Sequence, residues 1–168
     1  HNTPDYCRVA GVFVGKGTVR NCLIIANTNT NTKTAYKDGT GAGVFMIGGK
    51  FYHNTVAGNY LKDDTTFRAG IYMENSNKGT PDVQNNIFWD NGTLAMRGGC
   101  CVKKGTFVNN IIDNEVKIDG ATGNRKEDPQ FIDPANADWR VNATSPAVDL
   151  GDLVGDITVD IRGRTRPL

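Results

Sequence analysis

The sequence lacks the features that would direct an interpretation toward a membrane, a nucleic acid or a zinc site. No apolar run is long enough to cross a bilayer, and no stretch of twelve or more residues has the period of an amphipathic helix. The 19 basic and 18 acidic residues leave a formal net charge of +1, which argues against nucleic acid or an anionic membrane as a partner. The cysteines have no CxxC spacing, and we expect all four to fill small apolar positions: Cys7, Cys22, Cys100 and Cys101.

Glycine, asparagine and threonine are abundant instead, and they favour turns and strands. One pattern occurs four times: a small residue and a glycine, followed by aliphatic, aromatic and aliphatic residues. The copies are AGVFV at 10–14, AGVFM at 42–46, AGIYM at 69–73 and a degraded GGCCV at 98–102. Their glycines stand at 11, 43, 70 and 99, in steps of 32, 27 and 29 residues. Self-similarity at such a period predicts a repeat architecture.

A second pattern alternates with the first and consists of a strand, an asparagine-centred corner, another strand and a terminal asparagine. Its copies are residues 19–27, 51–59, 83–91 and 107–114. Together the two patterns predict an all-β, parallel solenoid of about four coils, each with three short strands. Equivalent positions would then stack in four inward columns: Val12, Val44, Ile71 and Cys100; Val14, Met46, Met73 and Val102; Val19, Phe51, Val83 and Phe107; Ile24, Val56, Phe88 and Ile112.

The corner asparagines are expected to have structural roles. Asparagine tolerates the left-handed conformation that a sharp corner needs, and stacked amides can bond from coil to coil. This applies to Asn54, Asn86 and Asn110. His53 falls in the neighbouring column, with Asn21, Asn85 and Asn109, so we expect its ring to be satisfied within that column rather than to act as a catalytic base.

Periodicity ends after Asp119, where prolines and acidic turn residues become frequent. We therefore divide the chain into coils over residues 1–119 and an irregular C-terminal cap over residues 120–168, packed on the last coil. An open solenoid end exposes apolar core and unpaired strand edge, which such a cap would cover. The expected plugs are Phe131, Trp139, Val141 and Val148.

These residues resemble a known family. The coils are similar to the right-handed parallel β-helix repeats of pectate-lyase-like proteins. The tail resembles the segment that closes many secreted bacterial β-helix proteins, with DPQFIDP and DWRV at 128–141, SPAVDLG at 145–151 and DIRGR at 160–164. The resemblance implies a secreted or cell-surface bacterial setting, and folds of this family bear lyases, hydrolases, epimerases and non-catalytic glycan-binding proteins.

The chain carries no signal-peptide pattern and reaches its first repeat within about ten residues. The N-terminal coils and cap typical of the family are absent from it. We therefore interpret the chain as a fragment, and we expect self-association through an uncapped first coil, whose strand edges would be unpaired.

The outward face of the AGVFV-type strands is the expected ligand-binding surface. Phe13, Phe45 and Tyr72 would form an apolar strip there, leading to Glu74. These residues could stack against sugar rings. The alternative, which we favour, is that the loops at 28–41 and 60–68 or a neighbouring protein cover the strip, because exposed apolar strips are uncommon on soluble monomers.

Catalysis on the same face would require Lys103 or Arg97 as the base of a lyase acting on uronic acids, with Ca²⁺ held by Asp63 and Asp64. The simpler interpretation of these charges is a solvated surface ion pair. Hydrolysis by paired carboxylates is weaker still, because Glu74 has no acidic partner in its own column.

The balanced charge and the small number of acid–base residues favour a non-catalytic scaffold that binds glycan or protein. A polysaccharide lyase with a Lys or Arg base and Ca²⁺ is the alternative function. No cofactor is required by the first interpretation.

Overall fold

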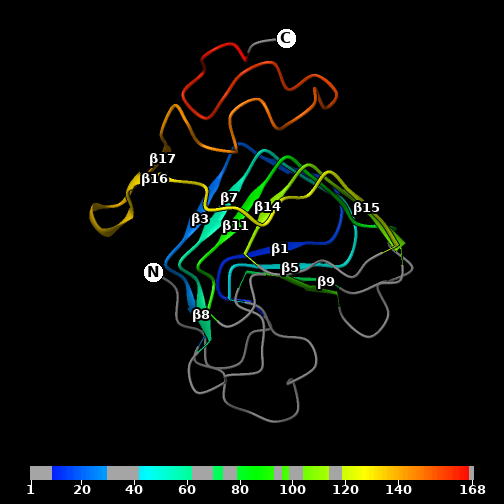
Figure 1. The fold of residues 1–168 in the computed structure, drawn as a ribbon. Helices are drawn as coiled ribbons and strands as arrows, with labels where there is room; N and C mark the ends of the chain where they lie inside the picture. Colours follow the sequence, from blue (N-terminus) through cyan, green and yellow to red (C-terminus); the bar gives the residue numbers. More distant parts are fainter. Residues whose placement is uncertain are drawn as a thin grey trace.

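The computed structural model of the chain describes residues 9–29, 42–61, 70–73, 79–92, 96–98, 104–113 and 119–166. Within these ranges the fold is all-β, built mainly from parallel sheets of very short strands (Figure 1). The described helical structure is a single 3₁₀ turn, Pro134–Asn136. The described part of the chain therefore includes no helix that could span a membrane.

Three parallel sheets each take one strand from successive repeats. The first has the order β1 (Val12–Val14), β5 (Val44–Met46), β9 (Ile71–Met73) and β12 (Met96–Gly98). The second runs β2 (Thr18–Arg20), β6 (Lys50–Tyr52), β10 (Asp82–Gln84), β13 (Lys104–Val108) and β15 (Asp119–Thr122). The third runs β3 (Leu23–Ile25), β7 (Thr55–Ala57), β11 (Ile87–Trp89) and β14 (Ile111–Ile112). A short pair, β4 (Thr28–Asn29) and β8 (Tyr60–Leu61), follows the first two repeats. We call the strands contributed by one repeat a rung.

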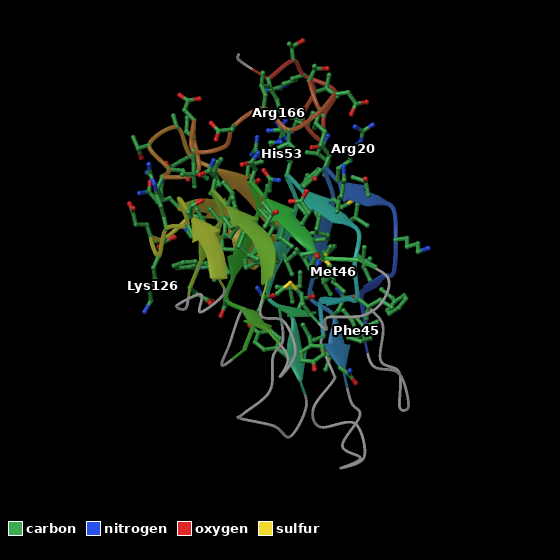
Figure 2. The ribbon with its side chains drawn as sticks, turned by 90° about the vertical axis from the view of Figure 1, so that its right-hand side faces the viewer. Arg20, Phe45, Met46, His53, Lys126 and Arg166 are labelled. Atoms are coloured by element: carbon green, nitrogen blue, oxygen red, sulfur yellow. The ribbon has the colours of Figure 1, made fainter. Side chains whose placement is uncertain are left out.

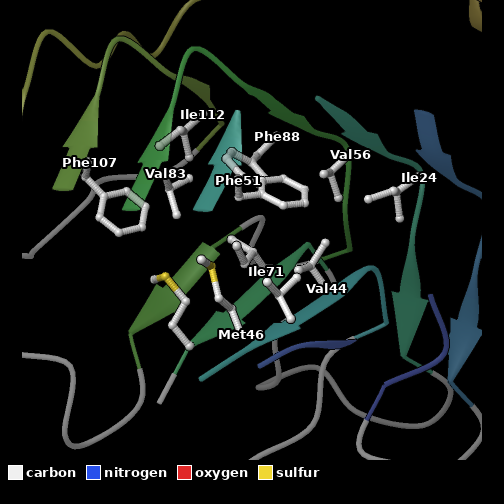
Figure 3. Close-up of a cluster of buried hydrophobic side chains, with 12 residues drawn as sticks. Ile24, Val44, Met46, Phe51, Val56, Ile71, Val83, Phe88, Phe107 and Ile112 are labelled. Atoms are coloured by element: carbon white, nitrogen blue, oxygen red, sulfur yellow. The ribbon is translucent and has the colours of Figure 1, made fainter. Parts of the chain in front are cut away.

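The core lies between these sheets, and it consists of the expected columns (Figure 3). Most of these strands are three residues long, so one or two side chains per strand point inward and a corner follows directly. Phe51 and Phe88 stack in its centre with ring centroids 6.1 Å apart. The fully or nearly fully buried members are Val14, Ile24, Val44, Met46, Phe51, Val56, Ile71, Met73, Val83, Phe88, Phe107 and Ile112. Val12 and Val19 of the first rung are partly buried against them. These inward assignments are confirmed.

The predicted register of the fourth AGVFV-type strand is wrong. Met96 pairs with Ile71, and Gly98 pairs with Met73, so the strand precedes the GGCCV copy instead of beginning within it. The sequence favoured 98–102 because a double glycine was matched to the earlier Ala-Gly pairs. Cys100 and Val102, which were expected to point inward, lie outside the described residues.

The parallel pairing also continues beyond Asp119, where periodicity was expected to end. Strand β15 pairs with β13, and the backbone of Arg125 bridges Ile111. This last rung follows its predecessor after only 14 residues, against 32 for the first two steps, which is why the sequence pattern missed it.

The C-terminal segment, residues 126–166, has a different construction. Strands β16 (Phe131–Asp133) and β17 (Asp138–Val141) form an antiparallel hairpin around the 3₁₀ turn, and Phe131 meets Trp139 edge to face at 5.2 Å. Acidic residues of the family-like tail shape the turns. Asp133 accepts a hydrogen bond from the Asn136 amide, and Asp160 accepts from the amides of Arg162 and Arg164.

This segment lies beside the rungs in Figure 1, and its contacts reach from the first rung to the fourth. The Asn21 amide donates to the Val159 carbonyl, and Asn109 donates to the Asp152 carboxylate. A side chain at Gly58 would meet the ring of Trp139 at 3.5 Å, so the second rung is also covered. The sequence predicted packing on the last coil, whereas the described contacts reach the first four of the five rungs.

Candidate functional site

The corners of the fold are held by a column of stacked amides that we call the inner ladder: Asn54, Asn86, Asn110 and Asn124. Each Nδ2 donates to the Oδ1 of the next member at 2.9–3.1 Å. The same nitrogen of Asn86 also donates to the Phe51 carbonyl of the rung before it, at 2.9 Å. Cys22 occupies the first position, where its backbone amide donates to Asn54 Oδ1. The predicted structural role of these asparagines is confirmed, and Asn124 is a member that the sequence analysis missed.

A second ladder stacks at the next corner and contains Asn27, Asn59 and Asn91. Asn59 Nδ2 donates to Asn91 Oδ1 at 2.7 Å and to the Ile24 carbonyl at 2.9 Å. Both Asn59 and Asn91 are fully buried. Leaving a buried amide without hydrogen-bond partners costs more free energy than a hydrogen bond contributes when it forms. Conformations that break these bonds are therefore disfavoured, and the two ladders hold the corners in place.

The left-handed conformation falls on a different residue than expected. It belongs to the residue before each ladder asparagine, and the ladder asparagines themselves do not have positive φ. In front of the inner ladder these residues are Asn21, His53, Asn85, Asn109 and Gly123. In front of the second ladder they are Ala26, Gly58 and Asp90. Two neighbouring residues therefore have separate roles at each corner. The first adopts the left-handed conformation that turns the chain, and the second bonds to the next rung.

The four side chains Asn21, His53, Asn85 and Asn109 form an outer column, and the C-terminal segment packs against it. Asn85 Nδ2 donates to the Asp152 carbonyl at 2.7 Å. Arg166 Nη2 donates to Asn21 Oδ1 at 2.9 Å, and its Nε donates to the Val159 carbonyl. The outer column thus provides most of the polar contacts that attach the C-terminal segment.

His53 lies within this column, as predicted. Asn85 Nδ2 is 3.3 Å from His53 Nε2, and because the amide nitrogen can only donate, the ring accepts there and carries its proton on Nδ1. Burial, together with the nearby charge of Arg166, lowers the pKa of His53 to about 4. The imidazole is therefore neutral near pH 7 and is a weak base.

A cavity of about 560 Å³ opens between the outer column and the C-terminal segment. We call it the column cavity. His53 and Arg166 both line it, and Figure 2 shows these two side chains close together. Its floor comes from the corners of four successive rungs, and its opposite wall comes from residues 147–153 and 160–166. The volume lies in the range typical of pockets for small ligands.

The column cavity offers polar groups that the protein itself leaves uncommitted. Among the described residues, no hydrogen bond involves the hydroxyl of Thr55, the carboxylate of Asp149 or Nδ1 of His53, and all three residues line the cavity. Asn85 Oδ1 is buried without a partner. Beside these groups lie three exposed apolar side chains: Leu23, Leu153 and Ile161. Exposed apolar groups gathered around one cavity are typical of a binding site.

The expected aromatic strip lies on the other side of the strands, where Figure 2 labels Phe45. Its rings do stack, with centroids 5.4 Å apart between Phe13 and Phe45 and again between Phe45 and Tyr72. Phe13 is 53% exposed, but Phe45 and Tyr72 are only 3% and 1% exposed. The two buried rings agree with the alternative in which the strip is covered, and Phe13 alone has an open face.

Most of the predicted catalytic residues and metal ligands fall outside the part of the chain that the structure describes. Lys103, Glu74, Asp63 and Asp64 lie outside the described residues, so the lyase base and the Ca²⁺ ligands stay predictions. The backbone of Arg97 pairs with Tyr72 in the first sheet. In the described part of the chain, no three His, Cys, Asp or Glu side chains are grouped so that they could hold a metal ion.

Sequence reasoning missed the column cavity because its two walls are far apart in the chain. Asp149 and Asp160 belong to the family-like tail motifs, and Arg166 follows them, yet these residues were used only to recognise the tail. Comparison with known proteins adds no template for the site: no protein-family model, no curated protein and no solved structure matches the chain.

Proposed function

We propose that this chain is a right-handed, single-stranded parallel β-helix module of the pectate-lyase-like kind that binds a glycan in the column cavity without cleaving it. The observation that carries the proposal is the composition of that cavity. Uncommitted donors and acceptors stand beside exposed leucine and isoleucine side chains. A sugar ring presents the matching surfaces, since its hydroxyls both donate and accept and its C–H faces are apolar.

The β-helix part of the proposal is supported by the register of the sheets. Each of three parallel sheets adds its strands in the order of the repeats, and the inner ladder runs through the same corner of successive rungs. The secreted or cell-surface bacterial setting is supported by the resemblance of residues 128–164 to tails of such proteins.

The non-catalytic part is supported by the state of the two most obvious reactive groups. His53 has a pKa of about 4 and contacts an amide rather than a carboxylate, so nothing orients it as a strong base. Asp160 is occupied by two backbone amides of its own turn. Binding requires neither group to exchange a proton.

The proposal is tested by screening the chain against a microarray of acidic, neutral and basic oligosaccharides, followed by calorimetry of the positive ligands. Leu153→Arg should weaken binding at least tenfold, because it places a bulky cation in the cavity. Ile132→Arg is the matched control, since Leu153 and Ile132 are 54% and 52% exposed but only Leu153 lines the cavity. Absence of binding to every glycan, or equal loss in both variants, would overturn the proposal.

The lyase alternative is tested in parallel. The chain is incubated with pectin, alginate and chondroitin in the presence of Ca²⁺, and absorbance from new unsaturated ends is recorded. We expect no signal. Absorbance that grows with time and disappears in Lys103→Ala would replace the binding proposal with the lyase.

A further inference from the structure

More acidic than basic side chains line the column cavity, and this excess limits the charge of the ligands that the cavity can bind. Three carboxylates line it, those of Asp149, Asp152 and Asp160, against one guanidinium, that of Arg166. His53 adds no charge near pH 7, because burial lowers its pKa. An anionic ligand would therefore enter a site with an excess of negative charge, which opposes its binding.

The three carboxylates are not equally available. Asp160 Oδ1 accepts the backbone amides of Arg162 and Arg164 at 2.8 and 2.9 Å, and the charge of Arg166 acts on the same carboxyl group. Asp160 is therefore occupied within its own turn. Its charge is also balanced by that of Arg166.

The carboxylates of Asp149 and Asp152 are the two that remain available to a ligand. Asp152 uses one oxygen, Oδ2, to accept from Asn109 Nδ2 at 2.9 Å, and its other oxygen has no partner among the described residues. Asp149 takes part in no hydrogen bond or ion pair in the described part of the chain. Both side chains belong to the exposed wall of the cavity and are three positions apart on the same segment.

We propose that the column cavity selects glycans that carry a free primary amine, the basic amino sugars. This inference rests on the glycan-binding function proposed above. The ammonium group supplies three donors, which Asp149 and the free oxygen of Asp152 can accept. The sugar ring lies against Leu153 and Leu23, and its hydroxyls meet Thr55 and His53. Arg166, which contacts Asn21 of the first rung, donates to ring or hydroxyl oxygens.

Arg166 can donate there without losing its present contacts. A guanidinium has five N–H donors, and the structure uses Nε for Val159 and one Nη2 hydrogen for Asn21. Both hydrogens on Nη1 and one on Nη2 stay available. The column cavity thus offers carboxylate oxygens to an amine and guanidinium N–H donors to oxygen acceptors.

The experiment compares a glucosamine trisaccharide with its fully N-acetylated counterpart by calorimetry, at a pH that keeps the amines protonated and at two salt concentrations. The free-amine trisaccharide should bind at least tenfold more tightly, and raising the salt should weaken only its binding. Asp149→Asn should remove at least fivefold of the affinity for the amine and leave the acetylated sugar unchanged. Asparagine tolerates the positive φ of 55° at this position, so the variant keeps its fold.

Glu127→Gln is the matched control, because it removes one exposed carboxylate of the C-terminal segment that does not line the cavity. Equal or tighter binding of the acetylated trisaccharide would overturn the amine preference while the glycan-binding function stands. An equal loss of affinity for the free-amine trisaccharide in Asp149→Asn and Glu127→Gln would have the same meaning. Binding of neither trisaccharide nor any other glycan on the array would instead overturn the proposed function itself.

Discussion

The rungs and the C-terminal segment hold their conformations by opposite means. In the rungs, apolar columns are fully buried between three sheets, and the amides at the corners are buried and bonded to one another. In the C-terminal segment, Ile157 is buried, but five large apolar residues are exposed: Ile132, Val148, Leu153, Val159 and Ile161. Short turns and polar contacts to the outer column hold this segment in place.

The difference separates stability from binding. Burial of apolar area supplies most of the free energy of folding, so the rungs should supply most of the stability of the molecule. Exposed polar contacts contribute little net free energy, so the C-terminal segment can vary its side chains at small cost. The column cavity lies where these two regions meet, with a rigid floor and a variable wall.

The sharpest test of the comparison is a core truncation. Phe88→Ala removes a fully buried ring that stacks on Phe51, and it should lower the free energy of unfolding by about 3–5 kcal/mol. Urea unfolding followed by circular dichroism measures the loss. Ile132→Ala, in the exposed position of the hairpin, should cost less than about 1 kcal/mol. Similar losses in the two variants would mean that the regions do not differ in this way.

The inner ladder gives the next largest effect. Asn86→Ala removes the bonds to Asn110 and to the Phe51 carbonyl, and it leaves the buried amide of Asn54 without its acceptor. We expect a loss of about 2–4 kcal/mol, because unsatisfied buried groups cost about 1–3 kcal/mol each. Asn136→Ala removes an exposed amide of the C-terminal segment and should cost well below half as much. A loss below about 1 kcal/mol in Asn86→Ala would show that the ladder is dispensable.

Lowering the pH should destabilise the protein through His53, which lies where the C-terminal segment packs on the rungs. The folded protein lowers the pKa of His53 from 6.5 to about 4, so between these values the unfolded chain binds more protons and stability falls as the pH falls. The full shift corresponds to about 3 kcal/mol, and partial exposure of the ring reduces this to about 1–2 kcal/mol. Chemical unfolding at several pH values between 4 and 7 measures it.

His53→Asn is the control for this prediction, because asparagine occupies the other three positions of the outer column with a similar backbone. The variant should remove this part of the pH dependence and leave stability near pH 7 almost unchanged. An unchanged pH dependence in the variant would assign the effect to other groups.

The smallest effect is expected at the exposed link between the two regions. Arg20 Nη1 lies 3.1 Å from Asp156 Oδ1, with side chains 46% and 90% exposed. Asp156→Asn should change the free energy of unfolding by about 0–1 kcal/mol, and less at high salt. Urea unfolding of the variant and the parent protein at low and high salt measures the change. A loss above about 2 kcal/mol would mean that this exposed ion pair contributes as much to stability as a buried contact.

The inward columns could be predicted because they depend on local pattern alone. Val44, Phe51 and Val56 stand at fixed offsets from a glycine and an asparagine, and a three-residue strand leaves them one direction to point. The fourth strand could not be placed in this way. Two adjacent glycines at 98 and 99 fit the pattern, while the strand forms at Met96–Gly98, where the pattern is weak.

The candidate site was less accessible to sequence reasoning. His53 was assigned correctly to a structural column, because its offset from Asn21 and Asn85 is readable in the repeats. Its neighbour Arg166 is not in any repeat, and nothing in the sequence shows that the tail returns to the first rung. The exposure of Phe13 against the burial of Phe45 likewise depends on tertiary packing.

The inner ladder has a consequence for how this chain tolerates insertions and deletions. Successive members are 32, 32, 24 and 14 residues apart, counted from Cys22 to Asn124, yet the backbone-to-amide bonds between them stay at 2.9–3.0 Å. The spacing of the rungs at this corner is thus independent of how much chain each repeat contains. Connections between rungs can therefore lengthen or shorten without changing the register of the strands. They are natural positions for grafted peptides and for rapid evolutionary change in loop length.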